Sequence, residues 1–376
     1  MKYGLGSGIL WGLDTLILGI AVSMAPLAEL SGAPIASAFL HDACCAIMLL
    51  LYMGLRGRLG DTVVALKTRS GRVVMVAALL GGPLGMTGYL IAIANIGSGY
   101  TAIISAFYPA VGTVLAVLAL HERMRVRQVI ALMAALGGVM TMGWMSAGAE
   151  ATAGDPLLGV TGALVCVFGW GSEAVILAWG MRDDAVDNET ALQIRETTSA
   201  LVYGLVVAPV AGALNLAGDV VTTPAMGVIA LAALAGTVSY LFYYQAINRI
   251  GAARGMALNI SYSAWAVIFG VIILGNIPQL LDIVCCVLIL GGTVLSATAE
   301  WVDLNMFKRE DPAVDPASGK SMPTTEDVSG KSVPATEEST LSSVSGGSTS
   351  AARDTASEKN TSTAMDSASS KDTLVK

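Results

Sequence analysis

Long apolar runs alternate with short polar connections along most of the chain. Ten of these runs are long enough for a helix that crosses a bilayer, which needs about 20 residues. The connections between them are short, which is typical of a compact helical bundle. We predict an all-α integral membrane protein with transmembrane helices at residues 4–24, 33–55, 73–94, 100–120, 127–147, 158–180, 192–214, 226–247, 254–274 and 279–298.

Basic residues are concentrated in every second connection. The connections near 25–32, 95–99, 148–157, 215–225 and 275–278 contain no lysine or arginine. Lysine and arginine favour cytoplasmic loops. The pattern predicts ten crossings of the plasma membrane with both termini in the cytoplasm, where the basic connections would carry Arg56, Arg58, Lys67, Arg69, Arg72, Arg123, Arg125, Arg127, Arg182, Arg249, Lys308 and Arg309.

Composition agrees with a membrane protein. Hydrophobic residues make up 54% of the chain and charged residues 13%, too few charges to cover a soluble protein of this size. Part of the net charge of −7 belongs to a polar tail, residues 304–376, which we predict to be disordered because it has almost no large apolar residue to bury. The five cysteines lie in apolar segments and match neither a disulfide framework nor metal spacing.

The chain contains an internal repeat. The segment 92–97 (AIANIG) matches 246–251 (AINRIG), and five spans in each half would insert the second half upside down. Inverted halves are a design of transporters, because rocking one half against the other alternates access. We predict repeats at 1–147 and 158–303. The same offset pairs Tyr89 with Tyr243, Tyr108 with Tyr262, Gly82 with Gly236, and His41-Asp42 with Arg195-Glu196.

With these halves, the chain resembles the EamA-type ten-helix branch of the drug/metabolite transporter superfamily. The resemblance rests on the paired halves, on Trp11-Gly12 in the first span, and on the sequence 121–123 (HER) before a glycine-rich fifth span. The second half departs from the pattern, with Gly275-Asn276 where Glu122-Arg123 would be expected. The resemblance implies a transporter of small metabolites such as amino acids, sugar- or nucleobase-like compounds, or amines.

Two intramembrane acids are candidates for binding a substrate. Asp14 and Glu173 lie inside spans, where an acidic side chain costs about 2.5–3.5 kcal/mol on insertion and therefore faces the bundle interior. Trp11 and Trp170 precede them by three residues, so each pair shares a helix face. An aromatic face beside a carboxylate suits an organic cation.

Further aromatic residues would complete such a cage. We predict that Tyr89, Tyr240, Tyr243, Tyr262 and Trp265 contribute to it, with ordinary packing as the alternative for each tyrosine. The paired aromatic residues and buried acids are similar to those of the choline and quaternary-ammonium importers of the superfamily. This second resemblance implies a cationic substrate.

A second set of residues is suited to coupling or gating. His41-Asp42 and Arg195-Glu196 lie within spans and must find partners there, either as a structural salt-bridge network or as a path for protons. Gly82 and Pro83 interrupt the third span and predict a kink or an unwound turn.

The sequence predicts a secondary transporter of a small organic cation, choline or a related quaternary amine, that works by alternating access. The alternative is an exporter of amino acids or other zwitterions, whose two charges the mixed pairs would recognise. No zinc spacing, phosphate-binding loop or nucleophile elbow is present, so we expect neither an enzyme nor a cofactor. The expected partners are a small molecule and the lipid bilayer, without nucleic acid; proton or ion coupling and the oligomeric state are left open.

Overall fold

The computed structural model describes residues 1–28, 30–147, 154–182 and 185–298. Within these ranges the regular structure is entirely helical, as the sequence predicts. The tail at 304–376, and residues 299–303 of the predicted second repeat, lie outside the described part of the chain.

Helices of the N-terminal part begin with a long apolar pair followed by a short helix of nine residues. α2 begins and ends at residues 33 and 55, where the sequence predicts it. The third run and the start of the fourth lie in one stretch of 37 residues, Arg69–Ser105, which is helical apart from a kink at Gly97. The observed elements are α1 (Lys2–Val22), α2 (Ala33–Leu55), α3 (Leu59–Lys67), α4 (Arg69–Leu79), η1 (Leu80–Met86), α5 (Thr87–Ser105), α6 (Tyr108–Leu120) and α7 (Val126–Ala147).

Helices of the C-terminal part follow a similar order. The seventh run starts at Asn188 instead of 192, because the side chain of Asp187 caps the helix by accepting from the Thr190 amide at 2.8 Å. The observed elements are α8 (Pro156–Gly180), α9 (Asn188–Val202), η2 (Tyr203–Val207), α10 (Ala208–Val210), α11 (Leu214–Val221), α12 (Pro224–Ile250), α13 (Ala252–Asn259), α14 (Tyr262–Leu274) and α15 (Leu280–Ala297).

Eight helical stretches in the described ranges are long and apolar enough to cross a membrane. α6 is apolar but has only 13 residues. α9 contains Arg195 and Glu196 and has 15 residues before the helix changes type at Tyr203. Length and composition therefore define a multi-pass membrane protein.

Glycines with positive φ mark two sharp breaks. Gly97 has φ 80° and ψ 164°, and Gly251 has φ 92° and ψ 161°. Side chains rarely tolerate this conformation, so glycine is needed at both positions. After each break a short helical piece ends just before a tyrosine, Tyr108 or Tyr262, that starts the next helix.

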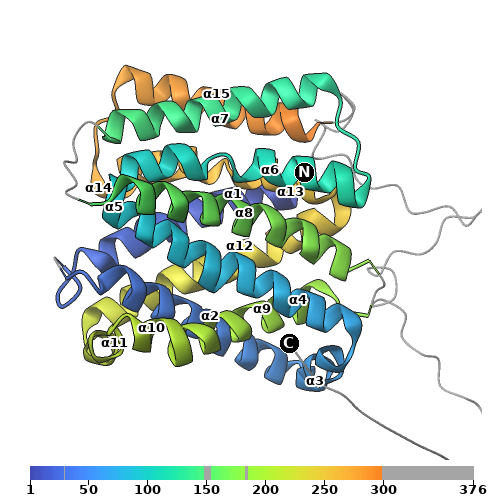
Figure 1. Cartoon of the computed structure of the whole chain (residues 1–376), viewed down its shortest axis with the longest axis vertical. Helices are drawn as coiled ribbons and strands as arrows, with labels where there is room; N and C mark the ends of the chain where they lie inside the picture. Colours follow the sequence, from blue (N-terminus) through green and yellow to red (C-terminus); the bar gives the residue numbers. More distant parts are fainter. Residues whose placement is uncertain (29, 148–153, 183–184, 299–376) are drawn as a thin grey trace, which may run out of the picture. The chain divides into compact units, whose positions relative to one another are not determined.

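Close packing through small residues holds the bundle together. α7 and α15 lie side by side (Figure 1), and a Cβ at Gly292 would lie 2.6 Å from the carbonyl oxygen of Ala131. α1 approaches α14 in the same way, because a Cβ at Gly12 would lie 2.7 Å from the Cβ of Trp265. Such contacts are typical of membrane helices, where small residues let backbones approach.

Candidate functional site

Six acidic and basic side chains of the described residues occupy the interior of the bundle. Because ionised side chains are costly in apolar helices, each must have partners. Asp14, His41, Arg195 and Glu196 are no more than 6% exposed. The buried charge cluster, as we call it, consists of Asp14 on α1, His41 and Asp42 on α2, Glu173 on α8, and Arg195 and Glu196 on α9.

His41 joins two acidic side chains. Its Nε2 lies 3.1 Å from Oδ1 of Asp14, and its Nδ1 lies 3.3 Å from Oδ1 of Asp42. A neutral imidazole has one donor nitrogen and one acceptor, so it donates to only one of the two carboxylates. One added proton, on His41 or on a carboxyl group, completes the second hydrogen bond. The arrangement is therefore able to hold a proton.

Arg195 is the centre of the other side of the cluster. Its Nε donates to Oε1 of Glu173 at 3.2 Å, and its Nη1 donates to Oε1 of Glu196 at 2.8 Å. Its Nη2 donates to the hydroxyl of Tyr240 at 2.9 Å, and its Cζ lies 4.4 Å from the centroid of that ring. All three guanidinium nitrogens are engaged within the protein.

The cluster contains more acidic than basic groups. Four carboxyl groups, those of Asp14, Asp42, Glu173 and Glu196, accompany one guanidinium and one imidazole. Oε2 of Glu196 is buried and has no hydrogen-bond partner in the part of the chain that the structure describes. An unpaired buried charge is strongly unfavourable. The cluster is therefore balanced only by added protons or by a bound cation.

Aromatic rings line the arginine side of the cluster. Trp11 packs edge-on against Tyr240, with ring centroids 4.7 Å apart. Tyr240 contacts Tyr244 at 6.2 Å, and Tyr244 contacts Tyr243 at 6.4 Å. The contacts place the predicted residues Trp11, Tyr240 and Tyr243 in one group.

Trp170 is the centre of a second aromatic group. Its ring lies 5.3 Å from that of Tyr89 and 5.6 Å from that of Tyr108, and its Nε1 donates to the carbonyl oxygen of Gly81 at 3.0 Å. Both aromatic groups contribute side chains to the same buried apolar cluster. The sequence predicted a single cage, whereas the ring contacts form two groups that border one interior.

Two predicted aromatic residues lie apart from these ring contacts. Trp265 pairs with Phe269 at 6.3 Å, and its buried Nε1 has no hydrogen-bond partner within the described ranges. Tyr262 is half-buried at the start of α14. Their positions follow from the close approach of α14 to α1, which the hydrophobic pattern alone does not reveal.

The predicted kink at Gly82 and Pro83 is a π-helix. η1 keeps the chain helical but widens the turn, which accommodates Pro83 without unwinding. Its glycines face the charge cluster, because a Cβ at Gly81 would collide with Oε2 of Glu173 and one at Gly82 with Oγ of Ser199. Bare backbone at these two positions makes room for the Glu173 carboxyl group and the Ser199 hydroxyl group.

Sequence reasoning did not single out Ser199 and did not assign Tyr108 to the site. Ser199 donates to Oδ2 of Asp42 at 2.5 Å and so connects α9 to the histidine side of the cluster. A serine among small apolar residues looks like ordinary packing, and only its spacing of four from Arg195 places it on the same helix face. For Tyr108, the signal was its match with Tyr262.

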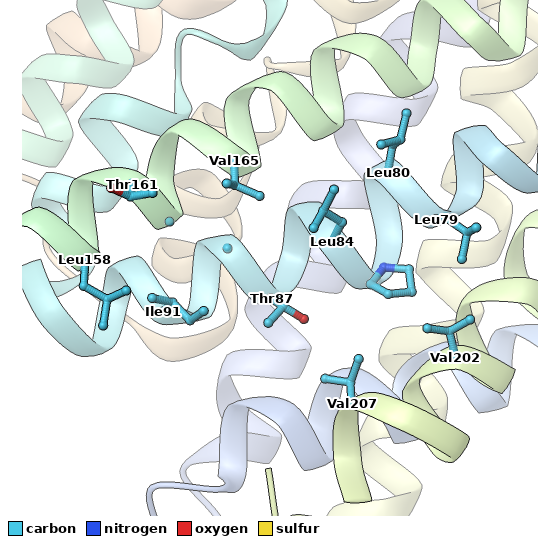
Figure 2. Close-up of a pocket in the computed structure, with 13 residues that line it drawn as sticks. Leu79, Leu80, Leu84, Thr87, Ile91, Leu158, Thr161, Val165, Val202 and Val207 are labelled. Atoms are coloured by element: carbon cyan, nitrogen blue, oxygen red, sulfur yellow. The ribbon is translucent and has the colours of Figure 1, made fainter. Parts of the chain in front are cut away.

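An apolar groove lies on the other side of η1. It has a volume of about 540 Å³, and Pro83 is among the residues that line it. Figure 2 shows the side chains around it, with Leu79 and Leu84 of the same helical stretch near Val202 and Val207. None of the residues that line it is titratable. The groove and the charge cluster therefore flank one π-turn, and the groove is distinct from the polar site.

Comparison with known proteins identifies the class. The model of the EamA-like transporter family matches residues 1–144 and 157–298, more than half of the 376 residues. The chain belongs to the EamA-like transporter family, which confirms the family predicted from the sequence. It is therefore a multi-pass membrane protein that transports small molecules.

The chain is also similar to individual proteins, at low sequence identity. Protein LicB of Haemophilus influenzae (strain ATCC 51907 / DSM 11121 / KW20 / Rd) is 24% identical over 299 residues, which are 78% of this chain and 96% of LicB. A crystal structure of another protein superposes with a TM-score of 0.59 at 17% identity, over 78% of this chain and 95% of that one. At this identity the superposition concerns the fold alone.

Proposed function

We propose that this chain is a secondary transporter that moves a small organic cation, choline or a related quaternary amine, across the plasma membrane by alternating access. The observation that carries the proposal is the excess of buried carboxyl groups beside aromatic rings. A cation bound there would balance the charge and would rest on aromatic faces, which contribute on the order of 2 kcal/mol when desolvated.

The engagement of Arg195 favours a cation over a zwitterion. An exporter of amino acids would need a positive group to bind the substrate carboxylate, and Arg195 is the cluster's one permanent cation. Its Nε, Nη1 and Nη2 already donate to Glu173, Glu196 and Tyr240. Zwitterion export is the second candidate, because release of one of these contacts would free a donor.

Transport of labelled choline tests the proposal. Vesicles that contain the full chain should take up radiolabelled choline, and Glu173→Gln should reduce uptake by about tenfold or more, because it removes one balancing charge. Asp219→Asn, an exposed carboxylate on α11, is the matched control and should transport like the wild type. No uptake by the wild type, or full uptake by Glu173→Gln, would falsify the cation assignment.

A ligand screen separates the two candidates. Amines alone should raise the unfolding temperature of the purified protein if the substrate is a cation. Stabilisation by amino acids without an effect of amines would favour the exporter.

We further propose ten crossings in two inverted halves, with both termini in the cytoplasm. The supporting observations are the positive-φ breaks at Gly97 and Gly251, the left-handed ends at His121 and Gly275, and the two segments matched by the family model. In this arrangement α6 is a full crossing together with the end of α5.

Cysteine labelling tests the topology. A cysteine placed at Ile277, which is 94% exposed, should react with a membrane-impermeant maleimide in intact cells. One placed at the exposed Arg123 should react only after the membrane is opened. The five native cysteines are buried and unpaired, so the background should be low. Equal reaction of both sites in intact cells would contradict the topology.

A further inference from the structure

A second groove runs along the exposed face of α7 and α15, and none of the residues that line it belongs to the charge cluster. It has a volume of about 440 Å³ and is lined by the aliphatic and small residues Ile130, Ala131, Ala134, Val287, Leu288, Gly291, Gly292 and Leu295, with Arg127 and Thr298 at one end. Ile130 is 63% exposed and Val287 66% exposed. In a membrane protein this face borders the lipid.

The glycines give the groove its depth. A Cβ at Gly292 would meet the Ala131 carbonyl at 2.6 Å, so this glycine brings α7 and α15 together. A Cβ at the neighbouring Gly291 would meet no atom within 4 Å, so Gly291 leaves open space. Gly292 therefore allows the close contact between the two helices, and Gly291 forms the floor of the groove beside that contact.

The polar end of the groove is basic. Arg127, in the first turn of α7, is half-buried, and its Nη2 donates to the carbonyl oxygen of Thr298 at 3.5 Å. Arg123 and Arg125 are exposed in the segment that leads into α7. An apolar groove that ends at the Arg127 guanidinium, with two further arginines in the adjoining segment, complements a phosphate group with an attached acyl chain.

We propose that this groove binds one anionic phospholipid, with an acyl chain along Gly291 and the phosphate at Arg127. A second copy of the chain is a less suitable occupant. A two-fold interface on this face would bring two sets of Arg123, Arg125 and Arg127 to the same depth, where like charges repel. An anionic lipid places the opposite charge there instead.

Native mass spectrometry of the full chain tests the lipid site. The protein in detergent receives equal amounts of dioleoyl phosphatidylglycerol and dioleoyl phosphatidylethanolamine. The wild type should retain one phosphatidylglycerol with a preference of about tenfold. Arg127→Gln should lose the preference, and Gly291→Phe should lose retention of both lipids, because its Cβ would meet no atom within 4 Å and its ring would occupy the groove.

Matched variants separate the site from general effects. Gly137→Phe adds the same ring on α7, at a glycine whose added Cβ would also meet no atom within 4 Å. Arg72→Gln removes an arginine that, like Arg127, donates to a backbone carbonyl. Both should retain the lipid like the wild type, and all variants should unfold within a few degrees of it.

Four results would overturn the proposal. The first is equal retention of the two lipids by the wild type, and the second is unchanged retention by Gly291→Phe. The third is a wild-type dimer that Gly291→Phe converts to a monomer, which would make the groove a subunit interface. The fourth is full displacement of the lipid by glycerol 3-phosphate, which would show that the site binds a phosphate group without an acyl chain.

Discussion

The guanidinium of Arg195 donates to Glu173, Glu196 and Tyr240 at once, and it is 5% exposed. Loss of this side chain would leave two carboxyl groups without their cation in the bundle interior. The penalty for an uncompensated buried charge is larger than the net gain from the pair itself. The cluster is therefore sensitive to the balance of charges more than to any single contact.

Arg195→Gln should lower the free energy of unfolding by about 3–5 kcal/mol. The double variant Arg195→Gln/Glu196→Gln should recover part of this loss, because it removes one of the unpaired charges. Chemical unfolding in detergent measures both. If the double variant is less stable than the single variant, the charge balance is not the cause.

Asp187 carries a separate, surface-exposed interaction. Partial burial raises its pKa, but hydrogen bonds from Thr190 and the ion pair with Arg58 outweigh this effect and hold the pKa of Asp187 below its ordinary value. A carboxyl group with a lowered native pKa stabilises the fold above its ordinary pKa. That contribution is lost as the pH falls through the lowered value.

Asp187→Asn should therefore cost about 0.5 kcal/mol at neutral pH, as exposed ion pairs do. The cost should vanish at a pH below the native pKa of the carboxyl group. Asparagine still caps α9, whereas Asp187→Ala should lose about 1 kcal/mol more at every pH because the cap is gone. Unfolding temperatures of the three proteins across pH measure this, and a pH-independent cost of Asp187→Asn would contradict the assignment.

At the scale of the element, η1 positions the acidic side of the site. Its widened turn presents the bare backbone of Gly81 and Gly82 to Glu173 and Ser199, and the Gly81 carbonyl accepts from Trp170. The sequence predicted an interruption at this place but not its form. A glycine-proline segment is compatible with a break or with a π-turn, and only the packing of α8 and α9 selects the latter.

Gly81→Ala should abolish transport with a smaller effect on stability. The added methyl group would collide with the Glu173 carboxyl group, which must turn away from Arg195. Gly227→Ala, at a glycine of α12 with open space around it, is the control and should transport normally. Uptake assays with both variants test this prediction. Normal transport by Gly81→Ala would show that η1 does not contribute to the transport site.

At the scale of the whole molecule, a contact joins the two parts of the chain that the family model matches. The carboxylate of Glu122 accepts from the backbone amides of Ala252 at 2.7 Å and Ala253 at 3.0 Å. It thereby caps the first turn of α13 directly after the break at Gly251. At the proposed repeat offset the equivalent residue is Asn276, whose side chain lies near Gly270 of the preceding helix, α14.

Glu122→Ala should cost about 2 kcal/mol, because two hydrogen bonds to a charged acceptor at a helix N-terminus are lost. Asn276→Ala is the matched control and should cost less than about 0.5 kcal/mol, as ordinary surface substitutions do. Unfolding experiments compare the two, and equal costs would show that Glu122 has no special role.

The positions of most long helices along the chain were predictable, because the length of each apolar run is a property of the sequence itself. The partners of the buried residues were only partly predictable. Neighbours in sequence, such as Arg195 and Glu196, were expected to pair. The contact of His41 with Asp14 depends on how α1 and α2 are rotated about their axes, and hydrophobic pattern does not specify this in helices that are apolar on every face.

The cap formed by Glu122 also bears on the rates at which the two sides of the carrier open. If the proposed halves rock to open each side in turn, the two openings do not begin from equal barriers. At one end the Glu122 carboxylate must release the backbone amides of Ala252 and Ala253. At the other end, the Asn276 side chain accepts from no pair of backbone amides within the described ranges. Opening at the Glu122 end would then be the slower step of the cycle, and the empty carrier would rest with its opposite side open.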